Sequence, residues 1–164
     1  MRPRAGCLNS WYTRTRLKTV SQGITAMIHT FEITLESAGN AEAHDITDQV
    51  ARGVGRSGMT GGIATIFCPS STSAVTTIEY ESGAVADLRR ALDEIAPPGS
   101  HYQHNLKWGD GNGHAHLRAA LMGPSLTVPF VEGQLMLGTW QQIIFLDFDN
   151  RPRKRKLMVQ VIGE

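Results

Sequence analysis

The sequence predicts an α+β fold with a largely antiparallel β-sheet or sandwich, two main helices and a short third helix. Strand-like segments far outnumber helical ones, and they do not alternate with helices one for one as in a parallel α/β protein. With 164 residues, of which 41% are hydrophobic and 19% charged, the chain is long enough for one domain with a sizeable core.

The first predicted elements are a half-buried strand and an amphipathic helix. Apolar and polar residues alternate from Ile28 to Leu35, so one face of this strand is apolar except for His29. A helix is expected to begin at Asp45, because Asp48 follows in a capping-box-like arrangement. Its apolar residues are spaced to cover one face: Ile46, Val50 and Val54. Gly58 ends it.

Two strands and the second helix follow. Segments 62–68 and 73–80 are rich in β-branched and aromatic residues, and Pro69 with the hydroxyl residues after it predicts a turn that joins them as a pair. From Gly83 to Ile95 apolar residues recur every three or four positions. The prolines at 97 and 98 prevent this helix from continuing.

The C-terminal third predicts a short helix and an antiparallel meander. Residues 116–122 favour a helix of two turns that ends at Gly123 and Pro124. Four strand-like segments follow, joined by turns that contain glycine, asparagine or proline: 125–130, 134–137, 140–148 and 153–162.

The charge distribution separates residues 1–26 from the rest of the chain. Five of the 16 basic residues and none of the 15 acidic ones lie in this segment, which lacks regular periodicity and the apolar core of a secretory signal. We interpret it as an N-terminal extension, which is either a disordered or targeting segment or the product of a start codon assigned too early, with Met27 as the working start. We expect a single domain over 27–164. That domain is mildly acidic, which argues against binding to nucleic acid.

Neither a membrane anchor nor a disulfide framework is indicated. No apolar stretch is long enough to cross a bilayer. Cys7 and Cys68 are far apart and lack the spacing of a cysteine zinc site, so we interpret them as unpaired thiols of a cytoplasmic protein.

Residues 100–123 hold four of the six histidines and are the strongest candidate for a functional site. His114 and His116 are separated by one residue: in extended backbone both rings face one side, whereas in a helix they diverge by about 200°. The pair therefore predicts non-helical backbone at His114. With His104 and either Asp110 or Asn112, it forms a donor set suited to a divalent ion such as zinc, nickel, cobalt or manganese, and poorly suited to magnesium alone.

Other interpretations of the histidines remain open. The same cluster could serve acid–base catalysis or phosphate binding without a metal, because histidine titrates near neutrality. For His29, His44 and His101 we favour ordinary surface or core positions with one hydrogen bond each.

Four segments carry a resemblance to a known family. They are STSAVTTIEYE (71–81), HNLKWGDGNGHAHLRAALMGPSLTVPF (104–130), GQLMLGTWQQIIFLDFDNRPR (133–153) and MVQVIG near the C-terminus. From about residue 27 onward the chain resembles the YjbQ family, also called secondary thiamine-phosphate synthase. The resemblance implies an α+β domain that assembles as a homotrimer, with the histidine cluster at or near a subunit interface. It also implies an activity, regarded as a side activity, that joins a hydroxymethylpyrimidine pyrophosphate to a thiazole phosphate and releases pyrophosphate.

The family's repeated polar positions fall on two stretches of this chain. They lie in the histidine segment and on the predicted strand pair: His104, Asp110, Asn112, His114 and His116, and Ser71, Thr72 and Glu79. Many members have a histidine directly before the two hydroxyl residues. This chain has Ser70 there, a departure that bears on any role of an imidazole at that position.

Such a transfer requires cations around the leaving pyrophosphate and groups that hold both substrates in line. Besides a metal ion on the histidines, Arg118 and Lys107 are candidates, and Lys107 would bind substrate together with Ser71 and Thr72. The basic run 151–156 is a further candidate, because its two arginines at 153 and 155 share strand parity with apolar residues. We favour its interpretation as a solvated strand end whose charges discourage edge pairing.

Three classes of function are therefore expected. The first is the transferase, with a divalent cofactor and a catalytic set of His104, Asp110, Asn112, Arg118 and Glu79. The second is a metal-dependent hydrolase that uses the same pocket. The third is a non-catalytic trimer that binds a phosphorylated metabolite or a metal.

Overall fold

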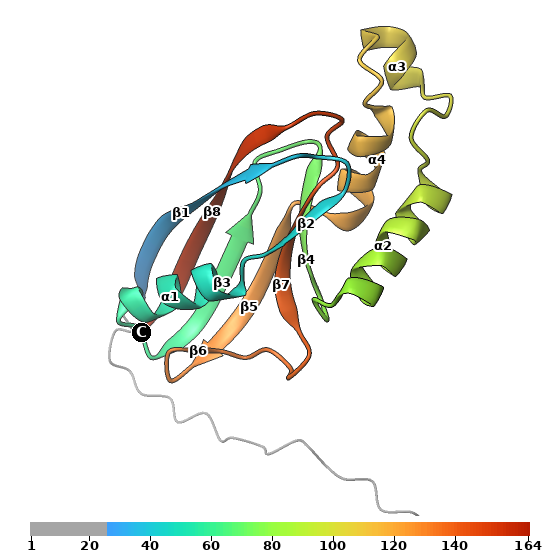
Figure 1. The fold of residues 1–164 in the computed structure, drawn as a ribbon. Coiled ribbons are helices and arrows are strands. Elements are labelled where there is room, and N and C mark those ends of the chain that lie inside the picture. The colour runs from blue at the N-terminus through green and yellow to red at the C-terminus, as the bar shows by residue number, and fades with distance from the viewer. Residues whose placement is uncertain (1–25) are drawn as a thin grey trace, which may run out of the picture.

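The computed structural model describes residues 26–164, and the N-terminal extension predicted for 1–26 lies almost entirely outside the described residues. Eight strands and four helices make up this part of the chain (Figure 1). In chain order they are β1 (Met27–Ser37), β2 (Glu42–Asp45), α1 (Thr47–Ser57), β3 (Gly61–Phe67), β4 (Ser73–Ile78), α2 (Ser82–Ile95), α3 (Gln103–Trp108), α4 (Gly113–Met122), β5 (Ser125–Val131), β6 (Gln134–Leu135), β7 (Gln142–Asp147) and β8 (Arg153–Gly163).

The strands form two antiparallel sheets, which confirms the α+β prediction. The larger sheet has the order β1-β8-β3-β5-β6 and the smaller one β2-β7-β4. One apolar core lies between the sheets and α1, and includes Ile33, Val54, Phe145 and Val159. A second core joins the other face of the small sheet to α2 and α4. β7 is therefore covered on both faces, which explains its uninterrupted apolar run from Ile143 to Leu146.

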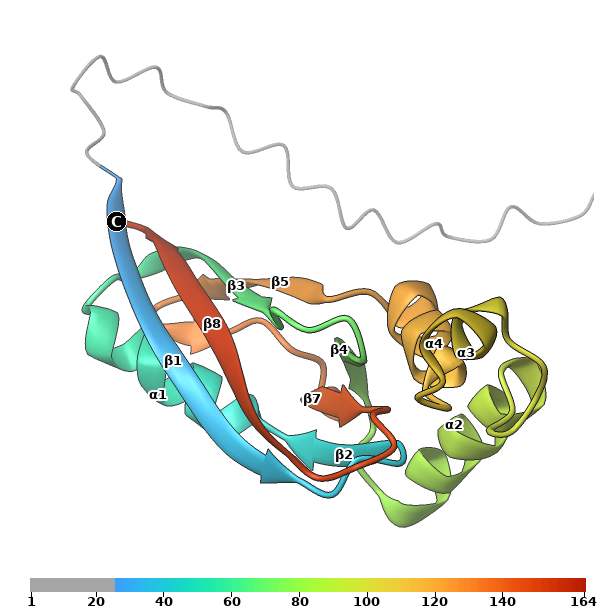
Figure 2. The same cartoon turned by 90° about the horizontal axis from the view of Figure 1, so that it is seen from above.

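Figure 2 shows this layering from above, with α2 and α4 beside the small sheet and the large sheet on the far side of it. The outer face of the large sheet carries no helix of the described residues. Its central rows are uncharged: Ile28, Ile162, Ile63 and Pro129 lie in one row, and Thr30, Gln160, Thr65 and Thr127 in the next.

Two predicted strand pairings are wrong. β3 does not pair with β4; it pairs with β5 and β8, and β4 pairs with β7. The turn at Pro69 instead carries the chain from one sheet to the other. The C-terminal meander is limited to β5 and β6, because β7 crosses to the small sheet and β8 returns to lie between β1 and β3. The four-residue strand β2 lacks a strand-like sequence pattern and was not predicted.

The first two helices agree with prediction within a few residues. α1 begins at Thr47, whose N–H and hydroxyl both donate to the carboxylate of Asp45 at 2.8 and 2.6 Å. α2 begins beside Glu81, whose carboxylate accepts hydrogen bonds from the backbone N–H of Gly83 and Ala84. None of the helices among residues 26–164 is both long and apolar enough to cross a bilayer.

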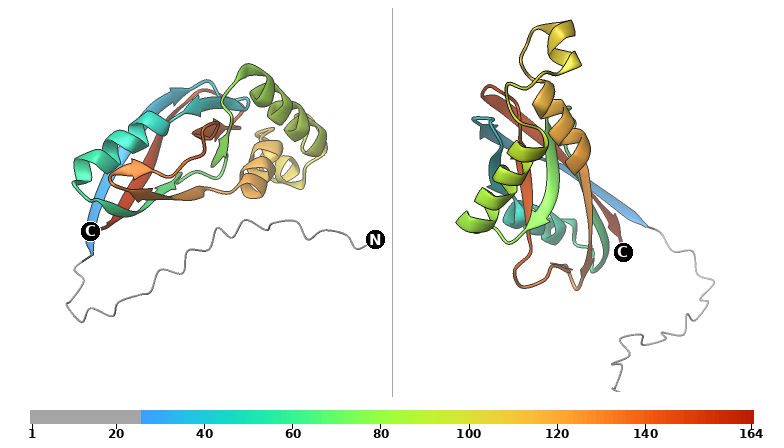
Figure 3. Two further views of the ribbon diagram at one scale, coloured as in Figure 1. Left: turned by 90° about the horizontal axis from the view of Figure 1, so that it is seen from below. Right: turned by 90° about the vertical axis from the view of Figure 1, so that its right-hand side faces the viewer.

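The histidine segment is more helical than predicted. α3 was not expected, and α4 begins at Gly113 rather than at His116. The side-chain oxygen of Asn105 accepts a hydrogen bond from the N–H of Gly113 at 2.8 Å, which holds the first turn of α4 against α3. α3 and α4 stand at one end of the molecule, away from α1 (Figures 1 and 3).

Candidate functional site

A trio of side chains, His104, Asp110 and His116, converges at the end of the molecule formed by α3 and α4. One ligand atom from each lies within 4.8 Å of the other two. The Nε2 atom of His104 is 3.3 Å from a carboxylate oxygen of Asp110, and the rings of His104 and His116 have centroids 4.3 Å apart.

The loop between α3 and α4 positions Asp110. Gly109 ends α3 with φ +67°, and Gly111 has the same φ, a conformation that favours glycine. The carboxylate of Asp110 accepts a hydrogen bond from the N–H of Asn112 at 3.1 Å. This hydrogen bond, followed by the contact with His104 and the charge of His116, holds the pKa of Asp110 below its ordinary value. The carboxylate is therefore ionised and available to a cation.

His114 does not join the trio. Because it lies in α4 only two residues before His116, the two rings point in different directions. The His114 side chain is 4% exposed and packs beside Tyr102, with ring centroids 6.5 Å apart. Burial lowers its pKa, and the charge of Arg118 lowers it further. The prediction of non-helical backbone at His114 is wrong, and the structure gives this histidine a core position.

A cavity of about 380 Å³ adjoins the trio. It is lined from three parts of the chain, namely the turn after β3, the α3–α4 loop with α4, and the β7–β8 turn with β8: Pro69, Ser70, Ser71, Thr72, Asp110, Asn112, His116, Asp149, Arg153 and Arg155. The predicted residues Ser71, Thr72, Asp110, Asn112 and His116 thus line one cavity together with two arginines of the basic run.

Arg155 is the centre of a buried ion-pair network beneath this cavity. Its guanidinium donates to both carboxylate oxygens of Asp147 at 2.6 and 2.7 Å, and to Asp149 at 3.2 Å. It also donates to the hydroxyls of Ser70 at 3.0 Å and Thr72 at 2.9 Å. Ser70 therefore has a structural role in this chain, as a hydrogen-bond partner of the guanidinium.

Asp149 connects the network to the rest of the site. It is 2% exposed and accepts hydrogen bonds from Arg153 at 2.9 Å, Thr72 at 3.2 Å and the side-chain amide of Asn112 at 3.4 Å. Burial alone would raise the pKa of Asp149, but the hydrogen bond and charge of Arg153, with Thr72 and Arg155, outweigh it and keep the pKa below its ordinary value.

Sequence reasoning missed Asp147 and Asp149. A signal was present: both acids share strand parity in the otherwise apolar segment IIFLDFD, and two arginines of matching parity follow in β8. Acids in a buried strand require cationic partners, and these arginines lie on the next strand along the chain.

The interpretation of the basic run as a solvated strand end is wrong for Arg153 and Arg155. β8 pairs with β1 along its whole length and with β3 from Met158 onward, and the side chains of these two arginines face inward, where acids bind them. Lys154 and Lys156 alternate with them and face outward, where Lys156 is 3.0 Å from Glu32.

Besides His114, three predicted residues lie apart from both the trio and the cavity. Arg118 is 2% exposed and donates to the carbonyl of Ala96 and to Asp93, which ties α4 to the end of α2. Lys107 is exposed on α3, with its ammonium 5.7 Å from the ring centre of Trp108. Glu79 is exposed just beyond β4, at the opposite end of that strand from Thr72.

A second cavity of about 260 Å³ meets the charged one at Ser70, Ser71 and His116. Its remaining lining is small and apolar: Ala119, Ala120 and Pro124. The two cavities thus bring a charged lining and an apolar lining together at His116.

The trio fits a divalent ion of the zinc class. Donors of a tetrahedral site with bonds of about 2.1 Å lie about 3.4 Å apart, and the contact of His104 with Asp110 already meets this spacing. The remaining separations are within 4.8 Å, so small side-chain rotations would complete a set of two imidazoles and one carboxylate. Three protein donors leave a position for substrate, as in catalytic sites.

Several known proteins are similar to this chain in sequence. A UPF0047 protein of Archaeoglobus fulgidus is 40% identical over 131 residues, which cover 80% of this chain and 99% of that protein. YugU of Bacillus subtilis, also described as a UPF0047 protein, is 34% identical over 139 residues, or 84% of this chain and 100% of that protein.

Solved structures show the same fold. A YbjQ-like protein of unknown function from Sulfolobus solfataricus superposes with a TM-score of 0.81 at 36% identity, covering 85% of this chain and 100% of that one. A YjbQ/UPF0047 protein from Clostridium acetobutylicum gives 0.74 at 36% identity, covering 80% and 98%. The sequence model described as "UPF0047 protein YjbQ-like" matches residues 31–164, and the chain therefore belongs to this family.

Proposed function

We propose that this protein is a metal-dependent transferase of the thiamine-phosphate synthase type, which joins a hydroxymethylpyrimidine pyrophosphate to a thiazole phosphate. The observation that carries the proposal is that the trio of His104, Asp110 and His116 borders a cavity that also holds Arg153 and Arg155. The resemblance of the chain to secondary thiamine-phosphate synthase supplies the reaction.

The charges of the cavity favour a metal cofactor. Arg153 and Arg155 face three carboxylates, those of Asp110, Asp147 and Asp149, so the protein alone presents no excess of positive charge to a pyrophosphate. A divalent cation on the trio would supply that charge and would stabilise the negative charge that builds up on the leaving group.

The reaction itself needs no proton transfer. The thiazole nitrogen forms a bond to the methylene carbon of the pyrimidine while the bond from that carbon to the pyrophosphate oxygen breaks, and the positive charge stays on the thiazolium ring. The imidazoles of His104 and His116 are therefore of more use as ligands than as general bases. Arg153, half-exposed at the cavity wall and paired only with Asp149, is the better candidate to bind a phosphate, because Arg155 is held by two carboxylates and two hydroxyls. The apolar cavity beside His116 would hold the pyrimidine ring.

A direct test is product analysis with both precursors and a series of divalent ions. Thiamine phosphate and pyrophosphate should appear in equal amounts and only with metal. His104→Ala and His116→Ala should each lower metal affinity at least about tenfold, since even partners outside the coordination shell contribute that much. His101→Ala, an exposed histidine of the same segment, is the matched control and should behave as wild type.

Other outcomes would identify the alternatives. Hydrolysis of phosphorylated compounds without transfer would indicate a metal-dependent hydrolase. Tight binding of a phosphorylated metabolite with no turnover would indicate a binding protein. Full metal binding by both alanine variants would refute the trio as the metal site.

We further propose that the protein acts in the cytoplasm as a homotrimer, as the family resemblance implies. The uncovered face of the five-stranded sheet supports this assembly, because its central rows are uncharged and include exposed isoleucines. A face of this kind is suited to burial against another subunit.

A further inference from the structure

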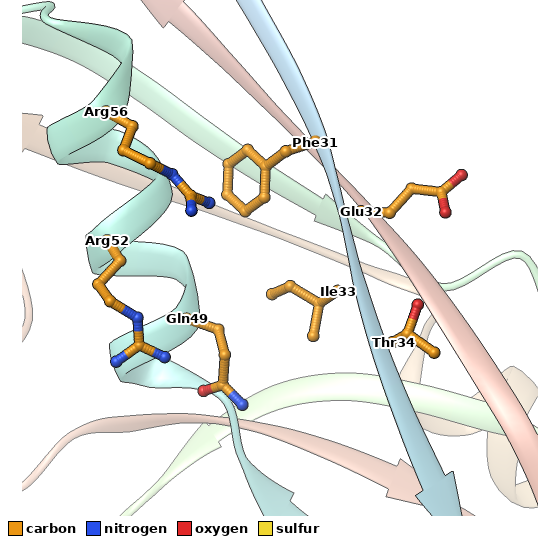
Figure 4. Close-up of a pocket in the computed structure, with 7 residues that line it drawn as sticks. All are labelled: Phe31, Glu32, Ile33, Thr34, Gln49, Arg52 and Arg56. Carbon is orange, nitrogen blue, oxygen red and sulfur yellow. The ribbon is translucent and has the colours of Figure 1, made fainter.

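A groove between α1 and β1 lies away from the trio and shares no lining residue with it. Its volume is about 240 Å³, and it is lined by four consecutive residues of β1, 31–34, and by Gln49, Arg52 and Arg56 of α1. Figure 4 shows the three α1 side chains directed toward Phe31 and Ile33, whereas Glu32 and Thr34 point away.

The wall of the groove formed by β1 is a strand edge. β1 is the terminal strand of the large sheet and pairs only with β8 within residues 26–164. The backbone N–H and C=O groups of every second residue therefore point away from β8, without a strand to bind them. This edge and α1 run side by side (Figure 4), an arrangement that other domains use to bind a peptide as an added strand.

Gly53 allows α1 to lie directly against the ring of Phe31. A Cβ atom at this position would overlap Cζ of Phe31, so a larger residue would require the ring or the helix to move. The groove is therefore a built feature of the fold.

The groove carries unbalanced positive charge. Arg52 and Arg56 are exposed, and neither makes an ion pair with an acid of the described residues. The nearby carboxylate of Glu32 points away and binds Lys156. Like charges one helical turn apart repel, so an anion between the two guanidinium groups would relieve this repulsion.

We propose that this groove binds an extended, acidic polypeptide segment of a partner protein, which adds a strand to the edge of β1. The spacings agree: residues four apart on a helix are about 6 Å apart along its axis, and alternate residues of a strand are about 6.6 Å apart. Acidic side chains at every second position of the segment would thus meet Arg52 and Arg56. The chain's own residues 1–26 contain no acid, so their charge excludes them as the occupant.

Fluorescence anisotropy with a labelled, N-acetylated peptide of alternating glutamate and valine tests the charge requirement. The peptide should bind at low salt, and Arg52→Gln with Arg56→Gln should weaken binding about tenfold, as the loss of two exposed ion pairs allows. Arg90→Gln removes an exposed arginine from α2 and should have no effect. No binding at millimolar peptide, or equal binding by the double variant, would overturn the proposal.

N-methylated peptides test the strand pairing. Two peptides are compared, each methylated on one of the two alternate sets of backbone nitrogens. One of the two should lose binding, because only one set faces β1, and the unmodified peptide should slow amide exchange in residues 31–35. Equal binding of both methylated peptides would show a simple carboxylate site and refute strand addition. Neither result depends on the trio, so the two proposals fail separately.

Discussion

At the scale of single residues, buried charged side chains join the chain segments that form the site. Asp147 and Asp149 are almost completely buried, yet both are satisfied by guanidinium groups and hydroxyls. Arg155 joins the turn at Ser70 to the end of β7, and Asp149 joins both to Asn112. The same ion pairs that hold the three chain segments together therefore also shape the cavity.

The depressed pKa of Asp149 makes a prediction about stability and pH. A carboxyl whose pKa is lower in the folded state stabilises the fold fully above its unfolded pKa of about 3.9, and this contribution is lost as the pH falls through the folded value. The wild-type free energy of unfolding should therefore fall below about pH 4. Asp149→Asn should be less stable at neutral pH and should lose less on acidification.

Urea denaturation over a series of pH values measures this difference. Asp87→Asn is the control, because Asp87 is exposed on α2 and forms only a surface ion pair. If the free energies of unfolding of wild type and Asp149→Asn changed with pH in parallel, Asp149 would not be the group whose protonation destabilises the fold.

Part of this site could be predicted from the sequence. The segment with His104, Asp110 and His116 was found because histidines are rare elsewhere and glycines surround them. The buried position of His114 was not predicted. Side chains two residues apart face the same side in an extended chain but different sides in a helix, and the start of α4 was predicted three residues too late. Arg118 resembled a cationic catalyst in sequence, but its partners Asp93 and the Ala96 carbonyl come from α2 and are visible only in the fold.

At the scale of elements, the contact of α1 with β1 gives a second prediction. Gly53→Ala improves helix propensity by about 1 kcal/mol, yet its methyl group would collide with the ring of Phe31. Overpacking of this kind costs about 1–3 kcal/mol, so the variant should be destabilised. Gly55→Ala lies in the same helix with nothing within 4 Å of the added Cβ, and it should be stabilised by up to about 1 kcal/mol.

Thermal or urea unfolding of both glycine variants measures the contrast. Opposite signs would confirm that the close approach of α1 to β1, and with it the groove, depends on Gly53. Equal stabilisation of the two would contradict it.

Most elements could be predicted because their sequence periods are clear, as in β1, α2 and β8. Strand pairing was not predictable from these local patterns. The chain from Cys68 to Thr72 resembles an ordinary turn, and nothing local indicates that it crosses between sheets. β8 is placed between β1 and β3 by contacts with residues more than ninety positions away, and such long-range pairing has no signal in a single sequence.

At the scale of the whole molecule, α3 and α4 lie at one end and α1 at the opposite end (Figure 3). The trio belongs to the first end, and the groove lined by Arg52 and Arg56 belongs to the second. The uncovered face of the large sheet extends between them. The three proposals therefore use three separate surfaces, one for a small phosphorylated molecule, one for an acidic peptide and one for further copies of the chain.

The assembly proposal leads to the last prediction. Ile63 is 41% exposed at the centre of the apolar row, between Ile162 and Pro129. Replacing it with lysine should change the stability of the folded chain little, because surface substitutions are usually within about 0.5 kcal/mol. In a homotrimer packed through this face, however, the lysine would place a charge in a buried apolar contact and should dissociate the subunits. Light scattering or sedimentation would show a wild-type mass three times that of the chain and a smaller mass for the variant. Ile95→Lys, which changes an isoleucine 63% exposed at the end of α2, is the control and should leave the mass unchanged. A trimer that persists in Ile63→Lys would place the subunit interface on another surface, and a monomeric wild type would refute the assembly.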